Sequence, residues 1–87
     1  MKIRVMSVDN KTNSRTVTVR GSDDRIYFVR ETIEPETRAQ DILVTRMGSP
    51  EEAIGRFSSK ERGSRMNRTP ITVALAKARI IEERWIK

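Results

Sequence analysis

Residues 56–70 hold most of the excess positive charge of this sequence. The segment contains four arginines and one lysine but a single glutamate. The planar guanidinium of arginine donates hydrogen bonds in a geometry that fits phosphate, and small polar residues and Gly63 surround these cations. We therefore predict a phosphate-binding loop whose cations are Arg56, Lys60, Arg62, Arg65 and Arg68. The alternative is a solvated connector that is basic without binding a partner.

A second set of arginines lies in the first thirty residues, at positions 4, 15, 20, 25 and 30. Strand alternation puts Arg4 and Arg20 on polar faces, and Arg20 and Arg25 bracket one turn. If the polar faces coincide, they form an arginine-bearing sheet face of the kind that binds nucleic acid. Against this, Tyr27 is the one aromatic residue of these strands that could stack on a base. The alternative is that these charges only prevent edge-to-edge pairing of sheets.

Most catalytic chemistry is missing from the sequence. There is no His and no Cys, which excludes imidazole bases, thiol nucleophiles, disulfides and thiolate metal sites. The four glycines are scattered and make no phosphate-binding glycine-rich loop. We expect no enzyme activity, no catalytic residue, no metal site and no cofactor.

Two apolar residues near the C-terminus are candidates for contact with another protein. Trp85 either covers the core or anchors a partner, because tryptophan is frequent at binding hot spots. Ile80 lies off the main apolar stripe of its segment, which favours a protein contact. We therefore name Ile80 and Trp85 as candidate protein-binding residues.

Three segments of the first third should be strands. Residues 2–8, 15–20 and 25–30 alternate apolar and polar side chains or are rich in β-branched and aromatic residues. Asn, Asp, Gly and Ser fill the segments between them and are typical of turns. Connections this short force antiparallel pairing, so we predict a three-stranded meander.

The remaining residues read as helical. Apolar residues at helical spacing predict a helix over 35–47 that ends at Gly48. Ser49, Pro50 and the two glutamates that follow have the pattern of a capping box, and predict a short helix with Ala53, Ile54 and Phe57 facing inward. Residues 58–69 lack an apolar period and predict a loop. Thr69 and Pro70 then begin a final helix of roughly residues 70–86.

These elements make a single small domain over residues 1–87. We predict an α+β fold in which an N-terminal three-stranded antiparallel meander packs against two or three helices, the longest of them C-terminal. No apolar segment approaches the roughly 18 residues of a membrane helix, and the charged N-terminus lacks the apolar stretch of a signal peptide. We therefore expect an intracellular, cytoplasmic location and no membrane partner.

Composition favours a non-catalytic nucleic-acid-binding protein. The sequence has 18 Lys and Arg against 12 Asp and Glu, a net charge of +6, so affinity for DNA or RNA should depend strongly on salt. One alternative is a small protein-binding inhibitor or adaptor that docks on an acidic or nucleic-acid-bound protein surface, for example a virus-encoded protein that blocks a nucleic-acid-processing or defence complex of its host. Another is a structural subunit of an assembly, in which a homo-oligomer supplies burial that a short chain lacks.

Overall fold

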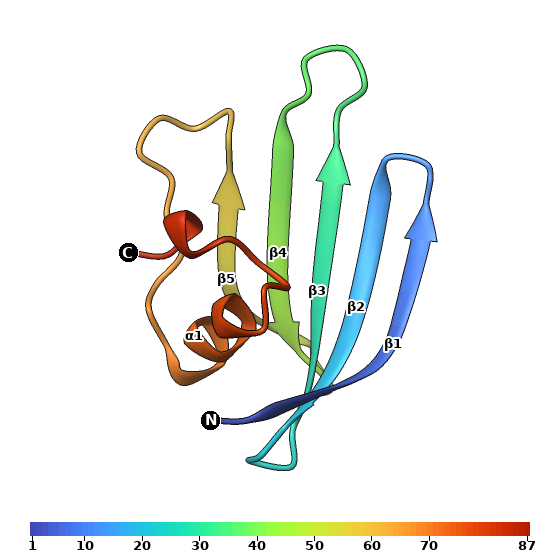
Figure 1. Ribbon diagram of the computed structural model, residues 1–87, viewed down its shortest axis with the longest axis vertical. Coiled ribbons are helices and arrows are strands. Elements are labelled where there is room, and N and C mark those ends of the chain that lie inside the picture. Colours follow the sequence, from blue (N-terminus) through green and yellow to red (C-terminus); the bar gives the residue numbers. More distant parts are fainter.

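The protein is one five-stranded antiparallel sheet with a short helical segment packed on one face (Figure 1). The computed structural model describes all residues from 1 to 87. Each strand pairs only with its neighbours in the chain, and the strands are β1 (Ile3–Lys11), β2 (Ser14–Gly21), β3 (Ile26–Ile33), β4 (Gln40–Arg46) and β5 (Glu52–Ser58). The helical elements are α1 (Pro70–Lys77) and the single 3-10 turn η1 (Glu83–Trp85). The predicted meander of three strands against two or three helices is therefore wrong as a fold class.

The first three strands do occur where the alternation predicted them, and they pair antiparallel. A tight turn joins β1 to β2 with Asn13 at a φ of 65°, and Asp24 at 63° ends the next turn. Asn and Asp are the residues that tolerate this left-handed backbone best. β1 carries a bulge between Val5 and Ser7, where Met6 has no partner in β2.

β4 stands where a helix over 35–47 with a cap at Gly48 was predicted. Ile42 and Val44 are buried on one face of β4, and Leu43 lies on the other face, only partly exposed. Apolar residues on both faces make a short run that fits a strand as well as a helix. The β-branched residues of this segment favour a strand. The strand is also stabilised by a full ladder with β3, which runs from Tyr27 opposite Arg46 to Ile33 opposite Gln40.

β5 replaces the helix that the apparent capping box predicted. The Ser49–Pro50 peptide is cis, and both glutamates contact strand side chains instead of capping a helix: Glu51 binds Arg30 and Glu52 binds Arg46. Of the three residues expected to face inward, Phe57 is buried, Ile54 is partly buried and Ala53 is exposed.

α1 begins where Thr69 and Pro70 predicted, but it is much shorter than residues 70–86. The Thr69 hydroxyl accepts a hydrogen bond from the Thr72 amide, and the Thr72 hydroxyl accepts one from the Thr69 amide. The helix ends at Lys77, and Arg79 takes a left-handed φ of 60°. Neither α1 nor η1 has the length and apolarity needed to cross a membrane.

The core lies between one face of the sheet and the segment that follows β5. Phe57 stacks on Trp85 with ring centroids 5.1 Å apart. Met66 covers Gly55 so closely that an added Cβ at Gly55 would lie 3.0 Å from the Met66 Cβ. The Met66 amide donates to the Trp85 carbonyl and the Lys87 amide to the Met66 carbonyl, at 2.8 and 3.0 Å, which fastens the end of the chain to the core. The opposite face of the sheet, called the outward face below, carries no second layer (Figure 1).

Candidate nucleic-acid interface

The register of the sheet aligns the side chains of the outward face in rows across the strands. Side chains of directly paired residues share a face. The row through the middle of β3 therefore contains Ser7, Thr18, Phe28, Thr45 and Ala53. The next row contains Asp9, Thr16, Arg30, Leu43 and Arg56. This face combines arginines, threonines and two partly exposed apolar side chains, Phe28 and Leu43.

Arg4 and Arg20 lie directly opposite each other on β1 and β2. Both are exposed, and neither forms an ion pair. The two polar faces that the alternation described are thus one face. Arg25 lies beside them in the chain, just after the turn, where its carbonyl accepts a hydrogen bond from the Gly21 amide and its side chain is also unpaired. Arg4 and Arg20 are thus two adjacent guanidinium groups without an ion-pair partner at this corner of the outward face.

Arg30 lies over the ring of Phe28 at the centre of the outward face. Its guanidinium carbon is 4.9 Å from the ring centroid, within cation–π range. Nη1 donates to the Thr45 hydroxyl and to Oε2 of Glu51, at 3.1 and 3.0 Å, and these contacts fix the guanidinium in place. The hydrogen bond from Arg30 lowers the pKa of Glu51 below its ordinary value. Arg30 therefore presents a flat, positioned guanidinium on a surface that solvent reaches.

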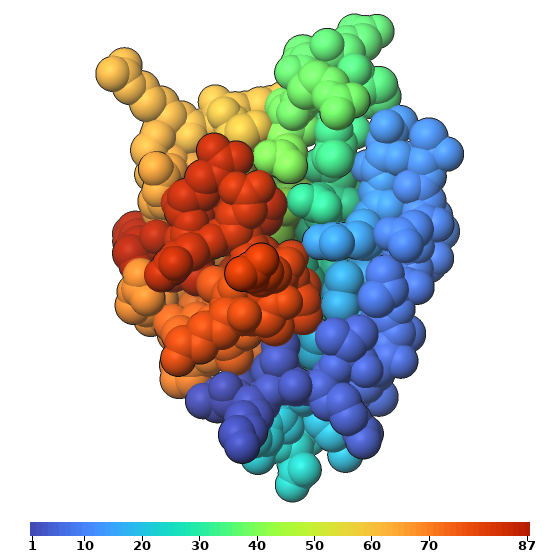
Figure 2. Space-filling view, in the orientation of Figure 1, coloured from blue at the N-terminus to red at the C-terminus, as the bar shows by residue number.

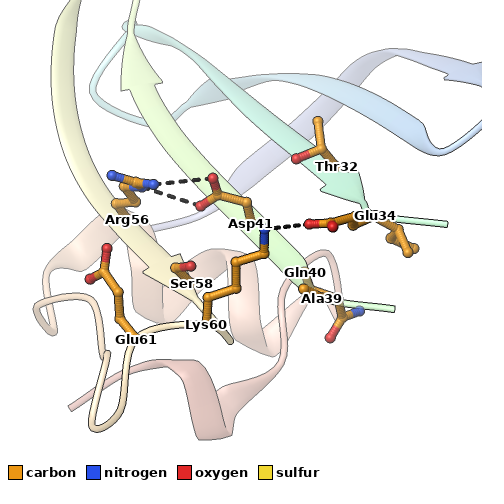
Figure 3. A pocket seen from close by; sticks show the side chains of 10 residues that line it. Thr32, Glu34, Ala39, Gln40, Asp41, Arg56, Ser58, Lys60 and Glu61 are labelled. Carbon is orange, nitrogen blue, oxygen red and sulfur yellow. Dashed lines mark hydrogen bonds and ion pairs between the residues drawn. The ribbon is translucent and has the colours of Figure 1, made fainter. Parts of the chain in front are cut away.

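A second pair of cations borders an open depression where β3 and β5 end and β4 begins (Figure 3). Arg56 donates through both Nε and Nη2 to the carboxylate of Asp41, each at 3.2 Å, and this contact raises the pKa of Arg56. Lys60 reaches across the depression to pair with Glu34. Each of these cations is paired with an acid, and Glu61 also lines the depression, so its two cations and three acids give a formal net charge of −1.

The five cations of the predicted basic loop lie on different parts of the structure. Arg56 belongs to β5 and the outward face, and Lys60 lies at the edge of that face. Arg62 is exposed and forms no ion pair or hydrogen bond with another side chain. Arg65 donates to the neighbouring Ser64 carbonyl at 2.7 Å, and Arg68 donates to the Lys87 carbonyl at 2.9 Å beside α1. The five cations do not form one cluster.

The two candidate protein-binding residues lie on the helix side. Trp85 is 3% exposed, and its indole Nε1 has no hydrogen-bond partner. Ile80 is partly buried against the core, and its carbonyl accepts a hydrogen bond from Nη2 of Arg15 at 3.1 Å. A partner would reach the indole only after the C-terminal segment moved.

Sequence reasoning missed the aromatic centre of the outward face. Tyr27 was the expected stacking residue, but its ring is 4% exposed on the core side and its hydroxyl donates to Asp23 at 2.6 Å. Period-two alternation with the buried Val29 places Tyr27 inside and Phe28 outside. That signal was present in the sequence; the contact between Phe28 and Arg30 was not.

No protein-family model, curated protein or solved structure matches this chain. Of the 18 basic side chains, six form ion pairs, and all six pairs are at least partly exposed to solvent. Most of the positive charge is consequently free to attract an anionic partner.

Proposed function

We propose that this chain binds single-stranded nucleic acid without catalysis, through the outward face of its sheet. The observation that carries the proposal is the stack of Arg30 on Phe28 at the centre of that face. Single-strand binding surfaces combine a flat stacking group with cations that follow the phosphate backbone. The guanidinium plane of Arg30 is such a group, because bases stack on guanidinium planes as well as on aromatic rings.

The cations on this face suit a path for the backbone. Arg4 and Arg20 lie unpaired at one corner and Arg56 toward the opposite edge, with Arg30 between them. Arg56 would exchange its exposed contact with Asp41 for a phosphate. At about 4.8 Å between strands and about 3.4 Å along a strand, the diagonal from Arg20 to Arg56 is about 20 Å long. That length fits the lower end of the site sizes of small single-strand-binding folds, about four nucleotides.

Binding should be measured by fluorescence anisotropy with labelled oligo-dT, oligo-rU and a DNA duplex at two salt concentrations. We expect both single strands to bind more tightly than the duplex. Arg20→Ala should weaken single-strand binding and reduce the salt slope by about 0.7. Phe28→Ala should weaken binding about tenfold, because it removes the ring that supports the Arg30 guanidinium, and a stacked base contributes ~1–3 kcal/mol.

Lys77→Ala is the matched control, because Lys77 is an exposed, unpaired cation at the end of α1 on the other side of the sheet. Equal losses for Arg20→Ala and Lys77→Ala would reject the outward face as the site. If Arg62→Ala and Arg65→Ala weaken binding and Arg20→Ala does not, the loop is the site instead. No binding at low salt would reject nucleic-acid binding altogether and favour the protein-binding alternative.

A further inference from the structure

β1 is an edge strand with an uncovered apolar surface. Five large apolar residues of the protein are strongly exposed, and three of them, Val5, Met6 and Val8, are in β1 with exposures of 48%, 46% and 52%. Figure 2 shows why: the C-terminal segment, in orange and red, covers the other part of the sheet and leaves most of the blue β1 uncovered. Long exposed edge strands with apolar side chains are templates for pairing with another strand.

The backbone of β1 determines which residues could form such a pair. In an antiparallel ladder, alternate residues direct their amide and carbonyl groups toward the neighbouring strand. The Lys2 carbonyl accepts from the Ser22 amide at 2.8 Å, so Lys2 and Arg4 face β2, whereas Ile3 and Val5 face the free edge. Beyond the bulge at Met6 the alternation changes phase. Lys11 pairs with Ser14 across the turn, so its backbone amide and carbonyl point toward β2. By alternation, the backbone groups of Val8 and Asn10 point toward the free edge.

We propose that two copies of this chain associate through antiparallel pairing of β1 with β1. Because the bulge changes the phase, one two-fold register joins all four edge-facing residues: Val5 opposite Val8 of the second copy, and Ile3 opposite its Asn10. The same register puts Arg4 opposite Asp9 of the second copy. Both of these residues lie on the outward face, and neither has an ion-pair partner within the chain.

This complementarity of charge and register indicates that the partner strand of β1 belongs to a second copy of the chain. The two-fold axis produces each contact twice, so two Arg–Asp pairs and two valine pairs hold the strands together. Cross-strand pairs of opposite charge and of β-branched residues both stabilise antiparallel strands. One pair opposes the association: Lys11 lies opposite Lys2 of the second copy, at the ends of the ladder. The proposal is independent of nucleic-acid binding and is tested without nucleic acid.

Sedimentation equilibrium over a range of protein concentrations tests the pairing by exchange of charges. Arg4→Asp places two carboxylates opposite each other in both symmetric contacts, and should raise the dimer dissociation constant by about tenfold. Combining Arg4→Asp with Asp9→Arg should restore it to near the wild-type value. Lys11→Glu should lower it, because it converts the unfavourable end pair into a favourable one.

Arg25→Asp is the control, since it makes the same charge reversal near the same corner but outside β1. It should not weaken the dimer. A chain that remains monomeric at the highest concentrations would overturn the proposal. A dimer dissociation constant that the Arg4 and Asp9 substitutions leave unchanged would also overturn it, because association would then use another surface.

Disulfide trapping tests the register directly, because the protein has no cysteine of its own. Val5→Cys and Val8→Cys chains mixed under mild oxidation should form the cross-linked heterodimer, since directly opposite Cβ atoms lie close enough for a disulfide. Each variant alone should cross-link far less, because its cysteines are not opposite each other. Cross-linking of Val5→Cys chains alone, equal to that of the mixture, would contradict the register.

Discussion

The Asp23 carboxylate connects the turn before β3 to the first core residue of that strand. It accepts hydrogen bonds from the Arg25 amide at 3.1 Å and from the Tyr27 hydroxyl at 2.6 Å. The Tyr27 bond lowers the pKa of Asp23 below its ordinary 3.8, whereas burial and then Asp23 raise the pKa of Tyr27 above its ordinary 10.0. The ionised Asp23 carboxylate therefore favours the neutral Tyr27 hydroxyl, and the neutral Tyr27 hydroxyl favours the ionised carboxylate.

These pKa directions predict how stability changes with pH. A lowered carboxyl pKa stabilises the fold fully above the unfolded value and loses that effect as the pH falls below about 4. A raised tyrosine pKa stabilises the fold below pH ~10 and loses that effect above it. Tyr27→Phe should therefore lower the Tm more at pH 7 than at pH 3, which thermal unfolding followed by circular dichroism would measure. In an Asp23→Asn background the difference between the two pH values should disappear. A Tm loss that is the same at both pH values in the wild-type background would contradict this account.

At the scale of elements, α1 ends in a Schellman motif built on an arginine. The Ile80 amide donates to the Leu75 carbonyl at 2.9 Å and the Arg79 amide to the Ala76 carbonyl at 3.0 Å. Glycine usually occupies the left-handed position of this motif, which here belongs to Arg79. With no glycine or proline to end it, the apolar period predicted a helix that continued to residue 86.

Arg79→Gly should therefore stabilise the protein. Relief of the left-handed strain, about 1–2 kcal/mol, exceeds the extra entropy of glycine in the unfolded chain, about 0.5–1 kcal/mol. We expect a net gain of about 0.5–1 kcal/mol in the free energy of unfolding, measured in urea. Arg79→Ala, which keeps the strain and removes the same charge, should give no such gain. A loss of stability in Arg79→Gly would show that the Arg79 side chain contributes more than the strain costs.

The elements that sequence reasoning predicted correctly are those whose signals are local. The strands up to Arg30 depend on alternation between adjacent turns, and the start of α1 depends on Thr69 and Thr72 within one helical turn. β4 and β5 depend instead on partners distant in the sequence. β4 is stabilised by its ladder with β3, and Glu51, before β5, binds Arg30 instead of capping a helix. For the site, alternation put Arg4 and Arg20 on the polar faces of their strands and left open whether those faces coincide. The register that joins the two faces and the Phe28–Arg30 stack required three-dimensional coordinates.

At the scale of the whole molecule, the two proposals make a joint prediction. Pairing through β1 would create one continuous sheet in which both outward faces look the same way, because directly paired residues share a face. An oligonucleotide long enough to reach both faces should then bind at least tenfold more tightly than one that covers a single face. Anisotropy with oligo-dT of increasing length would show a step in affinity.

Val8→Asn tests the origin of that step, because it weakens the edge without altering charge or the outward face. The step should vanish in this variant while affinity for the shortest oligonucleotide stays the same. A step that persists in Val8→Asn would mean that long strands bind by extension over one copy.

Because each strand pairs with the strand before it, the sheet can form through hairpins that close short loops quickly. Completion of the core is a different matter. The Ile80 carbonyl must accept its hydrogen bond from Arg15, sixty-five positions back in the chain, and Met66 must pack against Gly55. Contacts of the C-terminal segment should therefore form after the rate-limiting step of folding, so that weakening them hastens unfolding and leaves the folding rate almost unchanged.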